Sequence, residues 1–340
     1  MKAFSNGIRA YEWSYKQFKV LTLENKRLRV SLLPHKGSDI VEIRYKPKDV
    51  NVLLVLPLKF FLTTLPPSLR GTFFDYYEGG WQDIMPTAGE ASFELRGVRW
   101  EAHGESSLIP WEYSLIESND EVNIRLSTEL IRYPFKIEKV VKLREDSDSF
   151  EVYEKITNAS DEDLEYMWLQ HIMFSKPFLS SDCRIDIPAK TVITHGPPNF
   201  SDLSFLKPGV SFEWPYSVTR EDEKVDLSTL PTRYHKVYDI AYVTDLEEGR
   251  FSISSLSCGL SLEFRFPKEV FKYLWLMYVF GGPSEYPWYG RVWAFGVMPC
   301  TSYPACGLLR AIENRTARTL KGNGSIEARF TITLHEISDA

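Results

Sequence analysis

Apolar and polar residues alternate with a period of two along much of the chain, which is the pattern of half-buried β-strands. The clearest case is segment 325–334, in which every even position is apolar and every odd position is polar. Similar alternation covers 121–126, 135–143 and 150–156. Further strands are expected at 18–23, 28–33, 40–45, 111–116, 164–174, 251–256, 260–266, 273–279 and 291–297.

Turn-forming residues separate these strands, as at 118–120, 145–148 and 321–324. No window of twelve or more residues carries the apolar stripe of an amphipathic helix. More than a dozen short alternating strands are typical of two large sheets packed face to face. No change in composition marks a domain boundary. We therefore predict an all-β fold, a large antiparallel β-sandwich, as a single domain over residues 1–340.

The charge balance narrows the range of partners. The 340 residues include 40 Lys and Arg against 46 Asp and Glu, a net charge of −6. Nucleic acid and anionic membranes require a concentrated basic surface, so we expect neither as a partner. The longest apolar stretch, 50–65, is too short and too interrupted to span a membrane. Because the first residues lack the apolar core of a signal peptide, a cytoplasmic protein is expected.

Cysteine spacing gives no sign of a metal site. Cys183, Cys258, Cys300 and Cys306 form no CxxC pair and no ligand spacing with histidine, so we expect no metal site. Aromatic residues make up 14% of the chain. They favour strands, and their flat faces also suit the stacking of sugar rings. Composition alone does not choose between these uses.

Two of the six histidines stand out. His103 is followed by Gly104, which permits close approach of the backbone. His171 lies at the end of an aromatic strand, where a buried imidazole must either find a hydrogen-bond partner or serve a site. Both the structural and the functional interpretation stay open from the residues alone. His195 and His235 lie in polar loop segments, where we do not expect contact with a ligand.

Segment 275–291 combines large aromatic residues with Glu285, Trp288 and Arg291 around a glycine-containing turn. Aromatic faces, a planar guanidinium and a carboxylate together can hold a polyhydroxylated ring. A tightly packed hairpin with a salt bridge is the alternative.

These segments together resemble the aldose 1-epimerase (galactose mutarotase) superfamily. The resemblance covers roughly residues 20–335, in the family's order. It rests on the early strand pair 32–41, segment 79–86, His103-Gly104 followed by Trp111, the strand with His171, segment 236–239 and the late segment 286–304.

The resemblance implies a galactose mutarotase-like supersandwich and a reaction that needs no cofactor. In such enzymes a base takes the proton of the anomeric hydroxyl while an acid protonates the ring oxygen, so the ring opens and recloses as the other anomer. By the resemblance, His103 binds the sugar, His171 is the general acid and Asp239 also contacts the sugar.

One position departs from the family. Met298 stands where the family has the glutamate that acts as base, and a thioether cannot accept a proton. Glu285 is the first candidate for a substitute base because Gly281-Gly282-Pro283 could let its loop fold over the site, and Glu105 is the second. The expected site residues are therefore His171 and Glu285 as catalytic residues, and His103, Asp239, Trp288 and Arg291 as substrate-binding residues.

The expected function is that of an aldose 1-epimerase acting on a monosaccharide or sugar derivative. One alternative is a non-catalytic sugar-binding module, which would tolerate Met298. Another is a lyase or hydrolase that uses the same fold. A homodimer is left open.

Overall fold

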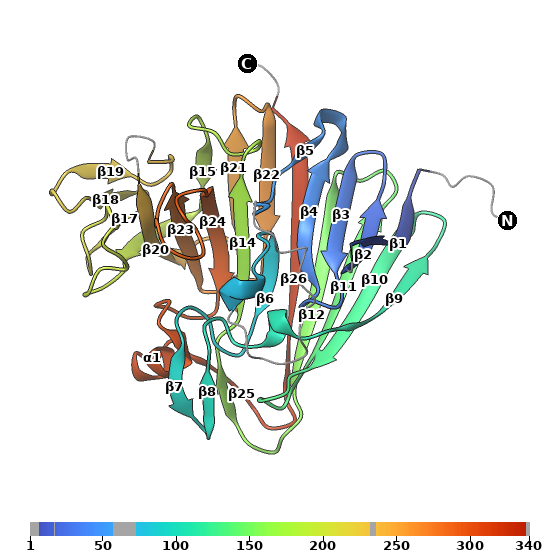
Figure 1. The fold of residues 1–340 in the computed structure, drawn as a ribbon, viewed down its shortest axis with the longest axis horizontal. Coiled ribbons are helices and arrows are strands. Elements are labelled where there is room, and N and C mark those ends of the chain that lie inside the picture. Colours follow the sequence, from blue (N-terminus) through green and yellow to red (C-terminus); the bar gives the residue numbers. More distant parts are fainter. Residues whose placement is uncertain (1–6, 17, 57–72, 232–235, 338–340) are drawn as a thin grey trace.

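Two large antiparallel sheets face each other in the structure, a computed structural model that describes residues 7–16, 18–56, 73–231 and 236–337 (Figure 1). The predicted all-β sandwich is confirmed. Within the described residues one sheet has twelve strands and the other has eight.

The twelve-stranded sheet contains, in spatial order, β1 (Arg9–Tyr15), β2 (Phe18–Glu24), β3 (Leu28–Leu33), β4 (Asp39–Tyr45), β6 (Trp81–Ile84), β14 (Leu169–Ser175), β24 (Trp293–Cys300), β23 (Tyr273–Phe280), β20 (Val237–Leu246), β16 (Ala189–Thr194) and β17 (Ser211–Glu213), with β5 (Val50–Asn51) beside β4.

The eight-stranded sheet contains β15 (Arg184–Asp186), β21 (Arg250–Ser255), β22 (Leu260–Arg265), β26 (Ser325–Glu336), β12 (Ser149–Asn158), β11 (Phe135–Arg144), β10 (Glu121–Glu129) and β9 (Glu112–Glu117). Short pairs are β7 (Ser92–Leu95) with β8 (Val98–Trp100), β13 (Leu164–Tyr166) with β25 (Arg318–Leu320), and β18 (Tyr216–Val218) with β19 (Lys224–Asp226). The helical segments are α1 (Gly307–Glu313) and 3₁₀ turns at Lys46–Lys48, Phe73–Tyr76 and Ser106–Leu108.

The eight-stranded sheet follows the alternation of its sequence. Along β11 and β12 every second residue is buried toward the other sheet, and most of these residues are apolar. The residues between them are half-buried or exposed on the outer face. The large core between the sheets includes Val141 on β11, Val152 on β12 and Phe330 on β26.

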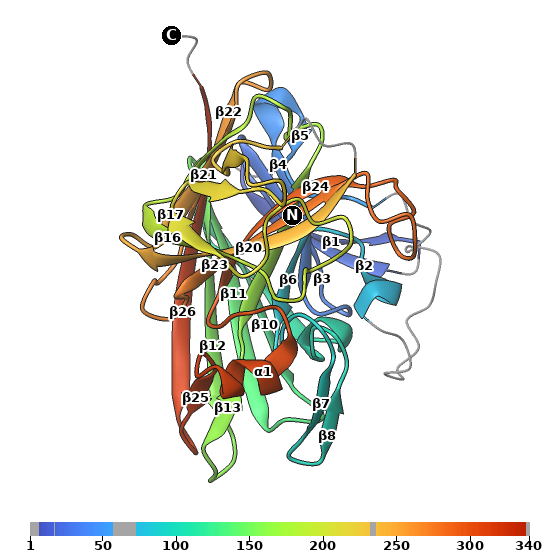
Figure 2. The same cartoon turned by 90° about the vertical axis from the view of Figure 1, so that its left-hand side faces the viewer.

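The central strands of the twelve-stranded sheet are covered on both faces. Every residue of β14 is buried, and so are all residues of β23 and β24 after the first. On β14, Ile172 and Phe174 join the core between the sheets, whereas Leu169 and Met173 join a second cluster on the opposite face. Residues of α1 and of the 73–77 segment pack onto this second cluster. Helix α1 lies beside the β7–β8 hairpin (Figure 1 and Figure 2).

The expected elements differ from the observed ones where a strand is buried on both faces and where a helix is very short. The strand expected at 164–174 is two strands, β13 and β14, separated by Met167 and Trp168. Strand β20 was not expected because it is apolar on both faces and shows little alternation. Helix α1 has seven residues, which is too short for the periodicity of a twelve-residue window.

Two buried lysines sit among carboxylates in the interior. Lys139 on β11 pairs with Asp83 at 2.6 Å and lies 3.8 Å from Glu154. Lys36 contacts Asp39 and lies 3.2 Å from Glu78. Each cation is fully buried, so each depends on its carboxylates to offset the loss of hydration.

Three observations bear on membranes, disulfides and metals. No helix in the described part of the chain is long and apolar enough to cross a membrane. The four cysteines are free thiols. Across the described ranges, no three His, Cys, Asp or Glu side chains group as ligands for a metal ion.

Candidate functional site

The floor of the candidate site is a row of side chains across four adjacent strands. The strand register places Met173 on β14 opposite Gly296 on β24, Gly296 opposite Met277 on β23, and Met277 opposite Ile240 on β20. Gly296 has no side chain, and a Cβ there would lie 2.5 Å from Sδ of Met173. The glycine therefore leaves room for the methionine at the centre of the floor.

A second row of paired residues places His171 next to Met298, the position at which the sequence departs from the family pattern. Leu169 pairs with Cys300 and Met173 pairs with Gly296, so the same register places His171 opposite Met298. Met298 in turn pairs with Trp275 on β23. Alternation along β14 directs His171 to the same face as Met173.

A tight turn carries His103 to the same place. His103 has a left-handed backbone (φ 62°), and its N–H donates to the carbonyl of Gly89. Gly104 is also left-handed (φ 64°), and a Cβ there would lie 2.3 Å from the carbonyl oxygen of Met85. Only glycine fits this approach, which fixes the turn against the 85–89 segment.

The two imidazoles lie together in one pocket. Their ring centroids are 5.1 Å apart, and the ring of Phe73 contacts both. The cavity measures about 200 Å³. The residues that line it are Phe74, Tyr77, Gly89, Glu90, Ala102, His103, His171, Met173, Phe200, Tyr238, Ile240, Trp275, Met277, Val279, Trp288, Met298 and Ala305.

Burial keeps both imidazoles neutral at pH 7. It lowers the pKa of His103 to about 3. Burial also lowers the pKa of His171 well below 6.5, and the neighbouring His103 and Lys36 add to that effect. At neutral pH the pair therefore offers hydrogen bonds and a lone pair, with no positive charge.

The hydrogen bonds assign opposite tautomers to the two rings. The amide nitrogen of Gln82 donates to the carbonyl of Gly79, so its oxygen accepts from Nδ1–H of His171 at 3.2 Å. This leaves Nε2 of His171 as the acceptor. Nδ1 of His103 accepts the N–H of Gly89 at 3.3 Å, so Nε2 of His103 carries the proton. One ring is a donor and its neighbour an acceptor, which matches a hydroxyl group.

Among the other expected residues, Trp288 lines the pocket and Arg291 does not. Trp288 is buried, and its ring lies about 6 Å from those of Phe74, Tyr77 and Tyr238. Arg291 is exposed, and its guanidinium lies 5.6 Å from the centre of the Tyr289 ring.

Asp239 lies on the opposite face of β20 from the pocket. Its carboxylate accepts backbone N–H groups of Phe205, Leu206 and Ile240. Burial raises its pKa to about 6 despite these bonds. The neighbouring residue Tyr238 faces the pocket instead. Tyr238 and Ile240 are two residues apart on β20 and therefore face the same side. This alternation is the signal that distinguishes Tyr238 from Asp239 as a pocket residue.

Neither of the two carboxylates considered as the base lines the pocket. Glu285 is exposed on a turn. Glu105 is buried, and its Oε1 accepts the N–H of Arg132 at 2.9 Å. Among the described lining residues the carboxylate is that of Glu90, on the exposed rim. Glu90 and Tyr77 lie in irregular segments, where no periodicity pointed to them.

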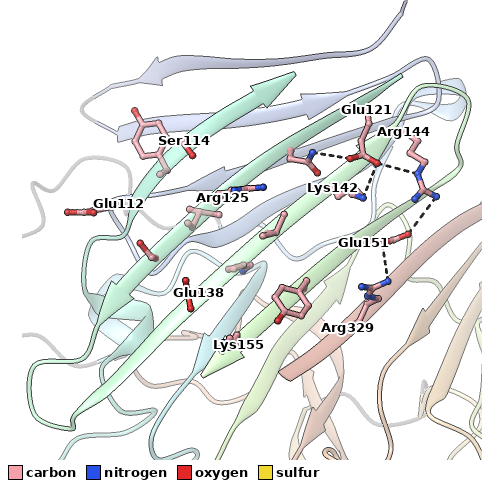
Figure 3. Close-up of a pocket in the computed structure, with 17 residues that line it drawn as sticks. Glu112, Ser114, Glu121, Arg125, Glu138, Lys142, Arg144, Glu151, Lys155 and Arg329 are labelled. Carbon is pink, nitrogen blue, oxygen red and sulfur yellow. Dashed lines mark hydrogen bonds and ion pairs between the residues drawn. The ribbon is translucent and has the colours of Figure 1, made fainter. Parts of the chain in front are cut away.

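A larger hollow on the outer face of the eight-stranded sheet measures about 760 Å³ and contains none of the expected residues. Figure 3 shows its floor of paired charges: Glu121 with Lys142 and Arg144, and Glu151 with Arg144 and Arg329. Exposed pairs of this kind are common on solvent-facing sheets and contribute little to stability. Size therefore does not identify the site.

A third cleft of about 580 Å³ shares Glu90 with the histidine pocket. Here Nδ1 of His195 forms a hydrogen bond with the hydroxyl of Tyr242 at 2.5 Å, and Nε2 of the same ring lies 3.8 Å from Sγ of Cys306. Burial lowers the pKa of His195 to about 4 and raises that of Cys306 to about 11. His235 lies outside the described residues.

Solved structures share this arrangement of strands. A galactose mutarotase-like protein from Clostridium acetobutylicum aligns over 98% of this chain and 100% of its own, with a TM-score of 0.67 and 14% identity. The protein has the galactose mutarotase-like fold. A provisionally assigned aldose 1-epimerase from Klebsiella pneumoniae aligns over 99% of this chain and 90% of its own, with a TM-score of 0.71 and 15% identity.

Sequence comparison adds no assignment to the mutarotase-like fold. No protein-family model matches the chain, and no curated protein matches it. At identities this low, the structural likeness establishes the fold and leaves the activity to be argued from the pocket.

Proposed function

We propose that this mutarotase-like protein binds a monosaccharide in the histidine pocket and interconverts its anomers. The observation that carries the proposal is the pairing of His103 and His171, 5.1 Å apart, with one donor and one acceptor nitrogen. The aromatic wall that includes Trp288 supports it, because such faces pack against the C–H groups of a sugar ring.

The protonation states suggest how the proton moves. Because His171 is neutral at pH 7, its Nε2 first accepts the proton of the anomeric hydroxyl. As the C–O bond breaks, protonated His171 passes this proton to the ring oxygen, which also accepts a hydrogen bond from Nε2–H of His103. When the ring recloses, Nε2 of His171 takes the proton back from that oxygen and returns it to the oxygen on C1. The role of His171 thus begins as a base, whereas the family resemblance alone implied an acid.

A carboxylate base in place of His171 is the alternative assignment, and it is open to a direct test. Glu90 is preferred because it lines the pocket, whereas Glu285 lies outside the lining. A positioned acid or base contributes about 10²–10⁴-fold to a rate. Glu90→Gln should therefore slow anomer exchange by up to that factor if Glu90 takes part, and Glu285→Gln provides the competing assignment.

The experiment is anomer exchange on a panel of aldoses, followed by NMR, for wild type and for His171→Gln. Loss of exchange in His171→Gln, with wild-type rates in the exposed control Glu269→Gln, would support the proposal. If no aldose perturbs the ring signals of His103 and His171 at any concentration, the proposal is wrong.

A non-catalytic sugar-binding protein is the second candidate. It is favoured by Met298, which the strand register places opposite His171 and which supplies no proton acceptor. If wild type binds sugars without exchange and Met298→Glu gains exchange, this second candidate is correct.

A further inference from the structure

Few polar side-chain groups belong to the described lining of the histidine pocket. They include Nε2 of each histidine, the rim carboxylate of Glu90 and the hydroxyls of Tyr77 and Tyr238. The Tyr77 hydroxyl is fully buried and has no hydrogen-bond partner among the described residues. The Tyr238 hydroxyl accepts the indole N–H of Trp288 and can still donate its own proton. A ligand therefore meets its hydrogen-bonding groups on the histidines, the two tyrosines and Glu90.

The floor offers almost nothing to a hydroxyl group. It consists of the side chains of Met173, Met277 and Met298, with Ile240 and Val279 beside them. A thioether is a weak acceptor and no donor. A sugar hydroxyl pressed against this floor would lose its water without gaining a partner, which typically costs about tenfold in affinity.

The described lining of the pocket also holds no cation for an anionic sugar. No Lys or Arg is among the described residues that line it. Lys36, behind Phe73, is paired with the carboxylates of Asp39 and Glu78. The imidazoles are neutral at pH 7, and Glu90 would repel a phosphate. A phosphorylated or carboxylated sugar would therefore find no compensation for its charge among the described lining residues.

We infer that the pocket selects an uncharged deoxysugar, with its hydroxyl-bearing edge on the histidines and its deoxygenated edge on the methionine floor. This inference rests on the proposed function and narrows its substrate class. The cavity of about 200 Å³ is below the 300–1,000 Å³ typical of drug-sized ligands, which suits a single ring.

The test compares matched pairs of sugars that differ at one hydroxyl. The pairs are D-galactose with D-fucose, D-glucose with 6-deoxy-D-glucose, L-galactose with L-fucose, and L-mannose with L-rhamnose. D-glucose 6-phosphate is the charged member of the panel. Dissociation constants come from NMR titration of the imidazole signals in the full chain. The deoxy member of at least one pair should bind about tenfold more tightly, and glucose 6-phosphate should bind more weakly than glucose.

Two variants of the floor separate polarity from shape. Met298→Gln keeps the length of the side chain and adds a hydrogen-bonding amide, so it should abolish most of the deoxy preference. Met298→Leu keeps the floor apolar and should retain it. Because both variants change one buried side chain, a general loss of structure would affect the two alike and would appear in their melting temperatures.

The outcomes distinguish this inference from the proposed function. If the hydroxylated member binds as tightly as its deoxy partner in every pair, or if glucose 6-phosphate binds best, the inference is overturned and sugar binding stands. If no sugar in the panel binds, both are overturned.

Discussion

The two sheets of this protein differ in what covers the face that points away from the core. Along β11 and β12 of the eight-stranded sheet, one face enters the core and the other meets solvent. Along β14, β23 and β24 of the twelve-stranded sheet, one face enters the same core and the other forms the pocket floor. The sheet whose pattern is easiest to read carries paired charges on its outer face, whereas the sheet with the candidate chemistry is covered on both sides.

Because of this difference, the strands that are easiest to predict from the sequence are not the strands that form the candidate site. A solvent-facing strand must place polar residues at every second position, so its pattern is visible. A floor strand replaces those polar residues with Met, Trp and Ile, so its period of two disappears. The difference between the two faces is therefore best tested with pairs of variants, one at a residue that points inward and one at a residue that points outward.

The largest effect is expected from two lysines on the same strand. Lys139 on β11 points inward to Asp83, whereas Lys142 points outward to Glu121. Lys139→Met leaves buried carboxylates without their cation and should lower the free energy of unfolding by about 3–5 kcal/mol. Figure 3 shows Lys142 paired with Glu121 on the outer face. Lys142→Met should lower the free energy of unfolding by less than about 1 kcal/mol. Urea denaturation of both variants measures the contrast, and equal losses would refute it.

A smaller effect is expected at two left-handed glycines. Gly104→Ala must place a methyl group 2.3 Å from the Met85 carbonyl oxygen, so it should cost about 3 kcal/mol and displace His103. Gly97, in the β7–β8 turn, has φ 77° and nothing within 4 Å of its Cβ position. Gly97→Ala should cost about 1 kcal/mol, from backbone strain alone. Thermal denaturation gives the ranking, and the reverse order would contradict the packing described for the His103 turn.

The smallest of the three effects is a dependence on pH. The pKa of His103 is about 3 in the folded protein and about 6.5 when unfolded. The unfolded state therefore binds the proton first as the pH falls, so this contribution to stability is complete above pH 6.5 and declines below it. Between pH 7 and pH 5 the loss should be about 2 kcal/mol.

The raised pKa of Asp239, about 6, acts in the opposite direction over part of the same range. The relevant measurement is consequently the difference between wild type and His103→Gln, in which the contribution of Asp239 cancels. The exposed His335→Gln variant on β26 is the control and should keep the wild-type pH dependence. Parallel curves for wild type and His103→Gln would show that His103 is not buried in its neutral form.

Much of the fold could be predicted from the sequence, and the site could be predicted only in part. The expected strand at 28–33 coincides with β3, and the one at 325–334 lies within β26. His103 and His171 could be singled out because glycine and aromatic neighbours mark them. Their distance from each other depends on sheet order, which residue patterns do not encode.

The remaining site residues show why single positions are hard to assign. Asp239 and Tyr238 differ by one place along β20, and that place decides between the core and the pocket. The sequence points to Glu285 because its loop contains glycines, but the flexibility of a loop does not determine where a side chain lies. The assignments of Glu285, Asp239 and Arg291 stay predictions, as does the single domain.

The position of β26 has a consequence for biosynthesis. This strand follows all the other strands of the eight-stranded sheet in the sequence, yet it lies in the middle of that sheet, between β12 and β22. A chain emerging from the ribosome therefore holds β9–β12 and β21–β22 as two half-sheets with open edges until residues 325–336 are available. Such edges invite pairing with other chains, and closure over long sequence separations is slow. The nascent protein should consequently need protection until β26 has been synthesised, and a ribosome stalled before β26 should release an aggregation-prone chain.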